Sequence, residues 1–266
     1  MAVLVIASKR DPAAQNIAQQ LTQLKNFQET QTKDLLRAGE VFLKHVETDG
    51  IYTDKLDVDF VPETVIFASR HRSESNEPAM TTHWTGNTTG RADFGGKAKS
   101  LSPTDPRRLR SALLALDSAR EARKLNYAVT LEATHHGPTE LGTPTLFVEI
   151  GSTEKEWNDR EAGAAAGEAI WKAATDPTNG KAAVGFGGGH YCNKHCDAIR
   201  HEGYAFSHIF SKYFFGDYDR SLVRMAFDKT LGECRTAIID WKGIRGSERS
   251  VLVDDLKQMN VEIVRV

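Results

Sequence analysis

The chain has 266 residues, of which 40% are hydrophobic and 26% are charged, and its formal net charge is −2. A chain of this length can bury a large core, either in one α/β domain or in two smaller domains. The charge balance excludes a general electrostatic attraction to nucleic acid or to membranes, so a polyanionic partner would need a local basic patch.

Cysteine usage indicates a reducing compartment. The three cysteines, Cys192, Cys196 and Cys234, cannot pair completely and are too few for a disulfide framework. The apolar run 2–7 is too short for a signal sequence and follows no basic segment. No apolar stretch approaches the roughly 20 residues that span a bilayer. We therefore expect a cytoplasmic protein without a membrane segment.

Strands and helices are predicted to alternate along the chain. The apolar run 2–8 is typical of a buried strand, and Asp11-Pro12 supplies an N-cap and a first-turn proline for the next helix. Further strands are expected at 41–46, 64–69, 127–134, 145–150, 182–191 (running into a glycine turn), 234–241 and 261–266, with a short segment at 204–210. Helices are expected at 106–124, 154–175 (capped by Ser152 or Thr153), 193–201, 220–230 and 247–259. This alternation favours an α/β fold with a mixed, mostly parallel sheet in a single domain, 1–266.

The segment 71–105 shows little periodicity. A loop-rich segment of this length inside a compact domain is usually functional. Its last part, together with the helix start that follows, holds the main basic cluster of the chain, with Arg91, Lys97, Lys99, Arg107, Arg108 and Arg110. Cations at this density suit phosphate groups, and an ordinary solvated surface is the alternative.

Histidines stand at the carboxyl ends of three expected strands, in the stretches ETVIFASRH (His71), VTLEATHH (His135 and His136) and VGFGGGH (His190). Ligands of open α/β sheets bind at the carboxyl ends of the strands. One such histidine is ordinarily a core or surface residue, but three coincident placements favour a shared site at one rim of the sheet.

Two carboxylates, Glu132 and Glu149, accompany these histidines in apolar strands. A buried carboxylate costs free energy unless it is paired or binds a metal, and for Glu149 a buried Glu–Arg pair is an equally good explanation. Glu132 and His136 share one face of their strand, whereas His135 points away. Only the turn imposed by Gly137-Pro138 can bring both imidazoles to one site. Zinc suits such ligands, and a catalytic zinc lowers the pKa of its water to about 7, which favours hydrolysis of an ester or amide.

The glycine turn and the helix after it allow two further interpretations. Gly187–Gly189 could hold an anion at the start of the helix, although the nucleotide-binding motifs are lacking. Cys192, His195 and Cys196 would share one helix face, as in half of a structural zinc site. Because there is no second cysteine pair, we expect the thiols to pack in the core.

Three stretches carry a resemblance to a known family: SRHRSESNEPAMTTHWTGN (69–87), LEATHHGPTELGTPTLFVEIGSTEKEW (131–157) and GFGGGHYCNKH (185–195). They resemble the archaeal and plant type of D-aminoacyl-tRNA deacylase, and the opening ASKRDPAAQNI matches more weakly. The resemblance implies a zinc-dependent enzyme of chiral proofreading, which hydrolyses the ester of D-aminoacyl-tRNA to the free D-amino acid and tRNA. It also implies a three-layer fold similar to that of nucleoside phosphorylases and peptidyl-tRNA hydrolases.

The resemblance further implies roles for the residues at matching positions. The catalytic residues are interpreted as Glu132, His135, His136 and Glu149. The metal ligands are expected among His71, His83, His135, His136 and His190, and the substrate contacts at Ser73, Asn87, Thr139 and His195. If the chain acts on tRNA, the basic stretch described above, rather than any family motif, would hold phosphates of the acceptor end through Arg91, Lys97, Lys99, Arg107 and Arg108, together with Arg70 and Arg72.

The chain departs from the family pattern at Asn76, where glycine is expected, and at Cys192, Asn193 and Cys196, where a small residue, proline and threonine are expected.

Two other functions stay open: a metal-dependent hydrolase or phosphorylase of a small molecule such as a nucleoside or peptide, and a non-catalytic tRNA-binding protein with structural histidines. The expected partner is the acceptor end of D-aminoacyl-tRNA, with no membrane or DNA partner, and a monomer is the expected state.

Overall fold

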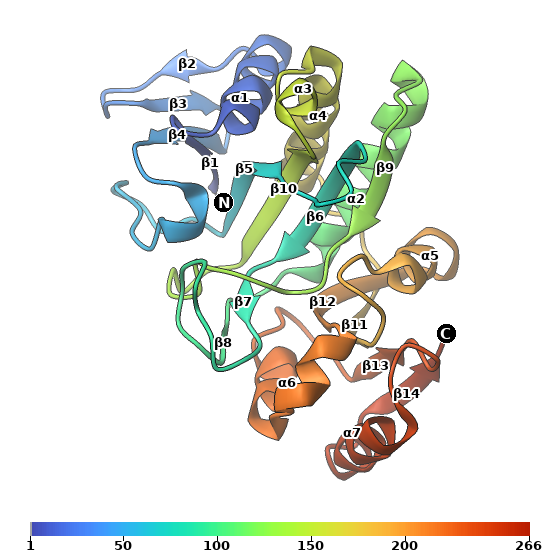
Figure 1. Cartoon of the computed structure of the whole chain (residues 1–266). Coiled ribbons are helices and arrows are strands. Elements are labelled where there is room, and N and C mark those ends of the chain that lie inside the picture. Colours follow the sequence, from blue (N-terminus) through green and yellow to red (C-terminus); the bar gives the residue numbers. More distant parts are fainter. Residues whose placement is uncertain (1) are drawn as a thin grey trace.

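The strands of the protein form two main sheets, as described for residues 2–266 by a computed structural model (Figure 1). The larger sheet has the order β2-β3-β4-β1-β5-β10-β6-β9, the smaller sheet has the order β12-β11-β13-β14, and β7 and β8 form a two-stranded ribbon. The strands are β1 (Val3–Ser8), β2 (Gln28–Glu29), β3 (Leu35–Ala38), β4 (Val41–Val46), β5 (Thr64–His71), β6 (Ala79–Trp84), β7 (Gly86–Asn87), β8 (Ser100–Leu101), β9 (Ala128–Leu131), β10 (Thr145–Gly151), β11 (Lys181–Phe186), β12 (Tyr204–Phe210), β13 (Thr236–Ile239) and β14 (Glu262–Arg265). The helices are α1 (Pro12–Lys25), α2 (Pro106–Arg123), α3 (Glu154–Trp157), α4 (Arg160–Thr175), α5 (Asn193–Glu202), α6 (Arg220–Asp228) and α7 (Gly246–Gln258), with 3-10 turns η1 (Gly50–Tyr52) and η2 (Lys212–Asp217). Among residues 2–266, no helix is both long enough and apolar enough to cross a lipid bilayer.

Strand direction is mixed in the larger sheet and parallel in the smaller one. In the larger sheet β1 runs parallel to β4 and β5, and β5 runs parallel to β10, whereas β6 is antiparallel to β10 and parallel to β9. In the smaller sheet β11 is parallel to β12 and β13, and β13 is parallel to β14. The prediction of an α/β fold with mixed, mostly parallel pairing is confirmed, with the difference that the strands divide between two sheets.

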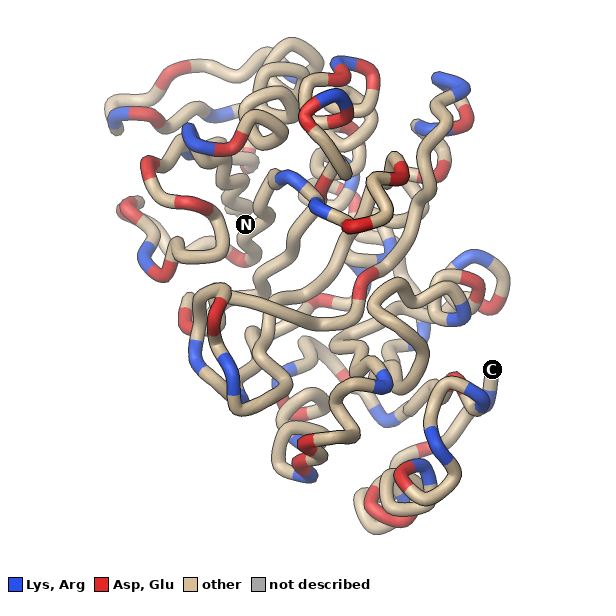
Figure 2. The backbone as a smooth tube through the Cα atoms, viewed as in Figure 1, with Lys and Arg blue, Asp and Glu red and all other residues tan. Residues whose placement is uncertain are grey.

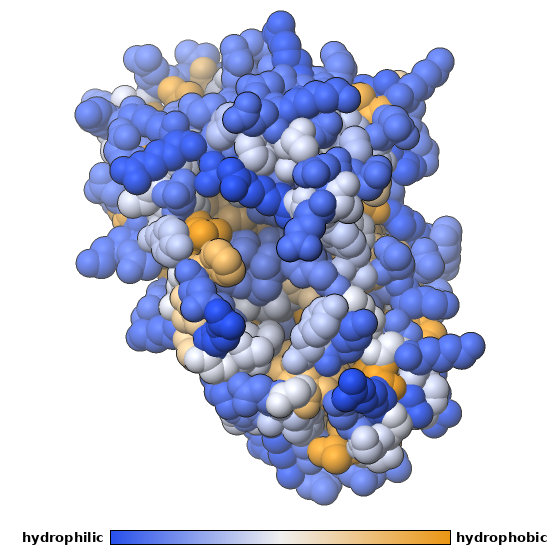
Figure 3. All heavy atoms as spheres, in the orientation of Figure 1, coloured by the Kyte–Doolittle hydropathy of each residue, from blue (hydrophilic) through white to orange (hydrophobic). Residues whose placement is uncertain are grey.

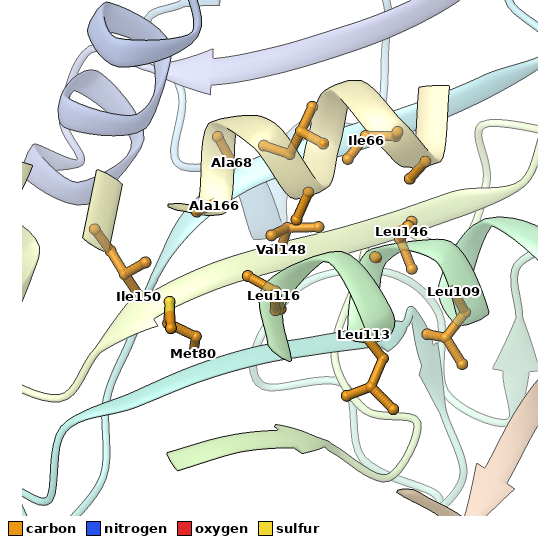
Figure 4. Close-up of a cluster of buried hydrophobic side chains, with 14 of the residues drawn as sticks. Ile66, Ala68, Met80, Leu109, Leu113, Leu116, Leu146, Val148, Ile150 and Ala166 are labelled. Carbon is orange, nitrogen blue, oxygen red and sulfur yellow. The ribbon is translucent and has the colours of Figure 1, made fainter. Parts of the chain in front are cut away.

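One face of the larger sheet holds the main hydrophobic core (Figure 4). Helices α1, α2 and α4 pack on β5, β6 and β10, and Ile66, Leu146 and Val148 point towards them. Leu113 and Leu116 of α2 are fully buried there, and burial of such a side chain contributes about 1.5–3 kcal/mol relative to its exposure. Because α2 also packs on β12, this helix connects the larger sheet to the smaller one.

The opposite face of the larger sheet is covered by irregular chain. The rings of Phe67 and Phe147 stack on this face with their centroids 4.6 Å apart, and the segment 47–63 packs over them through Ile51 and Phe60. The smaller sheet, by contrast, has α2 and α5 on one face and α6 and α7 on the other. The three-layer arrangement therefore holds for the smaller sheet, whereas the larger sheet has helices on one face only among the described residues.

Two local predictions differ from the structure. The helix expected from 154 to 175 is interrupted between α3 and α4, because Asp159 caps α4 by accepting hydrogen bonds from the backbone N–H groups of Glu161 and Ala162. The segment 71–105 contains a buried strand, β6, whose six residues all lie inside the larger sheet. Its centre is polar (Thr81–His83), so it lacks the apolar run by which a buried strand is recognised in a sequence.

The predicted helix caps are confirmed. The carboxylate of Asp11 accepts hydrogen bonds from the backbone N–H groups of Ala13 and Ala14, and Thr153 forms a capping box with Glu156. The second oxygen of Asp11 accepts a hydrogen bond of 2.9 Å from the backbone N–H of Arg70. One carboxylate therefore fixes the start of α1 to the end of β5, next to the cluster described below.

Candidate active site

Five histidine rings meet on the helix-free face of the larger sheet. They come from β5 (His71), β6 (His83), the turn after β9 (His135 and His136) and the loop after β11 (His190). The ring centroids of His83 and His135 are 4.2 Å apart, those of His135 and His136 are 4.4 Å apart, and those of His135 and His190 are 4.7 Å apart. The backbone of His136 adopts a left-handed φ of 45°, so the chain turns at the point expected from Gly137-Pro138. The structure thus brings all five candidate ligands together.

The cluster lies on the face of the sheet and not at a common rim of strand ends. Since β6 and β9 run opposite to β5 and β10, the carboxyl ends of these two pairs of strands point to opposite edges. Glu149 lies in the interior of the sheet, opposite Ser69 on one side and Thr81 on the other. The histidines converge, but the predicted reason for it, a shared carboxyl edge, is wrong.

Glu132 is the centre of the polar contacts. Its Oε1 lies 2.9 Å from Nδ1 of His71, and its Oε2 lies 2.6 Å from Nε2 of His190 and 3.5 Å from Nε2 of His135. Burial alone would raise the pKa of Glu132, but its contacts with His190 and His71 hold it well below its usual range. At His71 burial is likewise outweighed by the carboxylates, which raise its pKa to about 11. The structure therefore contains a buried ion pair between Glu132 and His71.

Glu149 has fewer partners. Its Oε2 accepts a hydrogen bond of 3.3 Å from Oγ1 of Thr81 and lies 3.6 Å from Nδ1 of His71 and 4.0 Å from Nε2 of His83. Burial, together with the negative charge of Glu132, raises the pKa of Glu149 in spite of His71. Two neighbouring carboxylates with pKa values shifted in opposite directions are typical of sites that separate acid and base roles.

Backbone carbonyls fix the tautomer of three histidines. In His83, His135 and His136, Nδ1 lies 3.2, 2.8 and 2.7 Å from a carbonyl oxygen of a residue close by in the chain. Because a carbonyl only accepts hydrogen bonds, each Nδ1 carries the proton and each Nε2 keeps its lone pair. Burial and the neighbouring rings lower the pKa of all three to about 3. The rings are therefore neutral, which metal ligation requires.

The donor set fits a transition metal. The ligand atoms of His83, His135 and His136 lie within 4.8 Å of one another, and two further groups with this spacing share Glu132. Nε2 of His83 is buried and has no hydrogen-bond partner among the described residues, and coordination to a cation would satisfy it. Three imidazole nitrogens oriented by carbonyls, with a carboxylate beside them, are a donor set that zinc accepts.

The cluster opens into a cavity of about 350 Å³, and Figure 3 shows a hollow in this face of the molecule. Besides histidines and both carboxylates, the lining includes Asp11, Ser69, Arg70, Arg72 and Phe94. A contact to the cluster that sequence reasoning missed is Tyr191, whose hydroxyl lies 2.8 Å from Nε2 of His71. In the sequence, only its position directly after His190 pointed to this contact.

The four predicted substrate contacts do not line the cavity. His195 is 1% exposed and packs edge-on against Phe206, so the prediction that it contacts substrate is wrong and its role is in the core. Ser73 lies in the turn after β5, where its hydroxyl is hydrogen-bonded to that of Ser75. Asn87 and Thr139 are buried and shape the loop 93–97: Asn87 donates hydrogen bonds to two of its carbonyls, and Thr139 accepts one from a backbone N–H.

Acidic side chains pair with the predicted phosphate-binding cations. Three cations near the ribbon β7–β8 have acidic partners on the surface: Arg91 with Asp93, Lys97 with Glu140, and Lys99 with Asp217 and Asp219. Figure 2 shows basic and acidic residues interspersed there. Exposed pairs of this kind contribute about 0–1 kcal/mol, so a phosphate can replace the carboxylate at little cost.

The two arginines at the start of α2 differ from these. Arg107 is half-exposed and pairs with Asp105 at 2.8 Å. Arg108 is 3% exposed, pairs with Asp105 and Glu63, and donates hydrogen bonds to two carbonyls at the end of α4. The prediction that Arg108 binds tRNA is therefore wrong, because its guanidinium is buried and already bound by two carboxylates and two backbone carbonyls.

The unusual residues in the motifs have local explanations. Asn76 adopts φ 55°, a left-handed conformation that glycine adopts freely and asparagine tolerates. Cys192 and Cys196 are each 1% exposed and belong to the main core, and Sγ of Cys196 accepts a hydrogen bond from the backbone N–H of Leu131. The thiols pack as expected and take no part in the histidine cluster.

The fold and the site define an α/β protein with a candidate metal centre of buried histidine and glutamate on a sheet face. A family model described as D-aminoacyl-tRNA deacylase matches residues 58–264. The D-aminoacyl-tRNA deacylases of Thermococcus onnurineus and Pyrococcus furiosus are 35% and 34% identical to this chain, each over 98% of the chain and 99% of their own length. A crystal structure of a conserved protein described as being of unknown function superposes with a TM-score of 0.90 at 33% identity, over 99% of this chain and 95% of its own. The chain therefore belongs to the D-aminoacyl-tRNA deacylase family, and the family prediction made from the motifs is confirmed.

Proposed function

We propose that the protein hydrolyses the ester bond of D-aminoacyl-tRNA and releases the free D-amino acid and the tRNA. Membership of the family supports this substrate class. The observation that carries the proposal is the convergence of neutral imidazoles and two buried carboxylates at one cavity. A protein that only bound tRNA would not need them, because RNA phosphates are bound mainly by Arg and Lys.

We assign the metal position to His83, His135 and His136. Their Nδ1 atoms donate to carbonyls, so their Nε2 atoms carry no proton and can each offer a lone pair to a metal. A zinc ion bound there would act as a Lewis acid on the ester carbonyl. Glu132 has both oxygens engaged by His71 and His190, so its role is to position these rings.

Glu149 is the proposed general base. It lines the cavity, and the contacts of its Oε2 to Thr81 and His71 are long. It would take a proton from the attacking water as the water oxygen bonds to the ester carbon. It would return that proton to the ribose oxygen as the bond from the ester carbon to this oxygen breaks.

Arg70 and Arg72 line the same cavity, and we assign them to phosphates of the acceptor end. The exposed cations Arg91, Lys97, Lys99 and Arg107 would extend this contact by exchanging their carboxylate partners for phosphate.

The test is deacylation of D-tyrosyl-tRNA and L-tyrosyl-tRNA by the purified protein, before and after removal of metal with a chelator. We expect hydrolysis of the D-ester alone, loss of activity after chelation, and recovery with added zinc. His135→Ala and His136→Ala should each abolish turnover, and full activity in both variants would refute the assigned roles. Turnover of nucleosides or peptides without any action on tRNA would instead favour a small-molecule hydrolase.

A further inference from the structure

An exposed phenylalanine stands at the mouth of the cavity. Phe94 lines the cavity together with Ile51, yet 64% of its surface is exposed. In Figure 3 an apolar patch lies on the rim of the hollow, where the segment of η1 meets the loop between β7 and β8 in Figure 1. Single exposed apolar residues are common on protein surfaces. Whether Phe94 has a function therefore depends on how its ring is held and on which residues surround it.

The backbone around Phe94 is fixed to the floor of the site. Its carbonyl accepts a hydrogen bond of 3.0 Å from the backbone N–H of Gly137, the residue after His136. The next residue, Gly95, has φ +79°, and a Cβ there would lie 1.9 Å from the carbonyl oxygen of Ile51. Only glycine permits this close packing of the loop on η1. Phe94 is thus held in a defined position beside the histidine cluster.

Cations line the same cavity. Arg70 lies 3.8 Å from Asp49, and the guanidinium of Arg72 lies 5.0 Å over the ring of Trp157. Within residues 2–266 no carboxylate forms an ion pair with Arg72, which is exposed. An aromatic platform next to cations that can track a backbone is the usual composition of a site for single-stranded nucleic acid. The acceptor end of tRNA is such a strand.

We propose that Phe94 stacks on the terminal base of the tRNA acceptor end. When the ester reaches the histidines at the floor of the cavity, the amino acid occupies the interior and the terminal ribose lies nearer the mouth, so its base extends to the rim. This inference rests on the proposed function. It adds a binding subsite for the terminal nucleobase, and this subsite does not contact the amino acid.

The direct test is binding of uncharged tRNA in which 2-aminopurine replaces the terminal adenine, because stacking quenches the fluorescence of this base. The wild-type protein and Phe94→Tyr should quench the signal. Phe94→Ala should lose most of the quenching and bind roughly 5- to 100-fold more weakly, the usual range for loss of one stacked base. Val251→Ala, which truncates a 52% exposed side chain on α7, is the control and should match the wild type. Undiminished quenching by Phe94→Ala would overturn the proposal.

A second measurement separates the base from the amino acid. We compare kcat/KM for D-tyrosyl-tRNA with that for D-tyrosine ethyl ester, which carries the same amino acid but no base. Phe94→Ala should lower the first value roughly 5- to 100-fold, mainly through KM, and leave the second unchanged. Equal losses on both esters would place the ring against the amino acid and overturn the proposal. If the wild-type protein hydrolysed neither ester, the proposed function would fail, whereas the 2-aminopurine signal would still report on Phe94.

Discussion

The hydroxyl of Tyr191 lies 2.8 Å from Nε2 of His71, while Nδ1 of the same ring lies 2.9 Å from Oε1 of Glu132. Both nitrogens of His71 are therefore engaged, and the ring is fixed from two sides. Tyr191 directly follows His190, so the loop after β11 supplies two side chains to a site built mostly on the larger sheet.

Tyr191→Phe should lower kcat about tenfold and change KM little, because His71, which lies 3.6 Å from the proposed base Glu149, loses the partner that fixes its other nitrogen. Tyr218→Phe is the matched control, since its hydroxyl also makes one side-chain hydrogen bond, of 2.7 Å to Asp255, away from the cavity. Steady-state kinetics on D-tyrosyl-tRNA measure both. An unchanged kcat in Tyr191→Phe would show that the contact does not position His71.

Glu149→Gln and Glu132→Gln should each lower activity, the first by slowing proton transfer and the second by weakening metal binding. If Glu149 transfers the proton, Glu149→Gln lowers kcat by about 10²–10⁴-fold while the bound zinc stays at the wild-type amount. Glu132→Gln removes the carboxylate charge that lies 3.5 Å from Nε2 of His135, one of the assigned metal ligands, and we expect a loss of metal affinity of about 10–100-fold. Single-turnover rates and metal analysis of the same samples distinguish them. Loss of zinc from Glu149→Gln would make that residue a ligand instead of a base.

Arg108→Ala should destabilise the fold without a specific effect on tRNA. Removal of the guanidinium leaves the buried carboxylate of Asp105 with one partner fewer, and loss of one partner of a buried ion pair typically costs about 3–5 kcal/mol. Urea unfolding measures this loss. Arg91→Ala, which breaks an exposed pair with Asp93, should change the free energy of unfolding by less than about 1 kcal/mol. Equal stability of the two variants would contradict a structural role for Arg108.

His208 predicts a loss of stability in mild acid. It is fully buried between Ser102 and Thr134, and burial lowers its pKa to about 4. The unfolded chain takes up a proton at this ring below about pH 6.5, whereas the folded protein does not until the pH approaches 4. Its contribution is therefore complete above pH 6.5 and declines as the pH falls to 4, by up to about 1.4 kcal/mol per pH unit. His208→Gln should have a shallower decline of unfolding free energy over this range, and an identical slope would exclude the effect.

Features that depend on local interactions could be predicted from the sequence without the structure. The caps at Asp11 and Thr153 depend on neighbours within three residues, and the apolar runs of β1, β5 and β10 have lengths and compositions typical of buried strands. The positions of His71, His135, His136 and His190 at or after the carboxyl ends of predicted strands indicated a common site, although the expected reason, a shared carboxyl edge, was wrong. In these cases the determining interactions lie within a few residues of one another in the chain.

The tertiary structure decided what depends on residues distant in the sequence. The polar strand β6 is recognised only when β10 and β9 pair with it, and its reversed direction moves the site from the sheet's edge to its helix-free face. Arg108 and Lys97 look alike in a basic stretch, but one is enclosed by α4 and the other is exposed. By itself, the sequence determined most of the elements, with β6 as the main exception, and the residue types that carry the chemistry. Direction, burial and the identity of each partner were left to the packing, because their free energies come from contacts that exist only after distant segments meet.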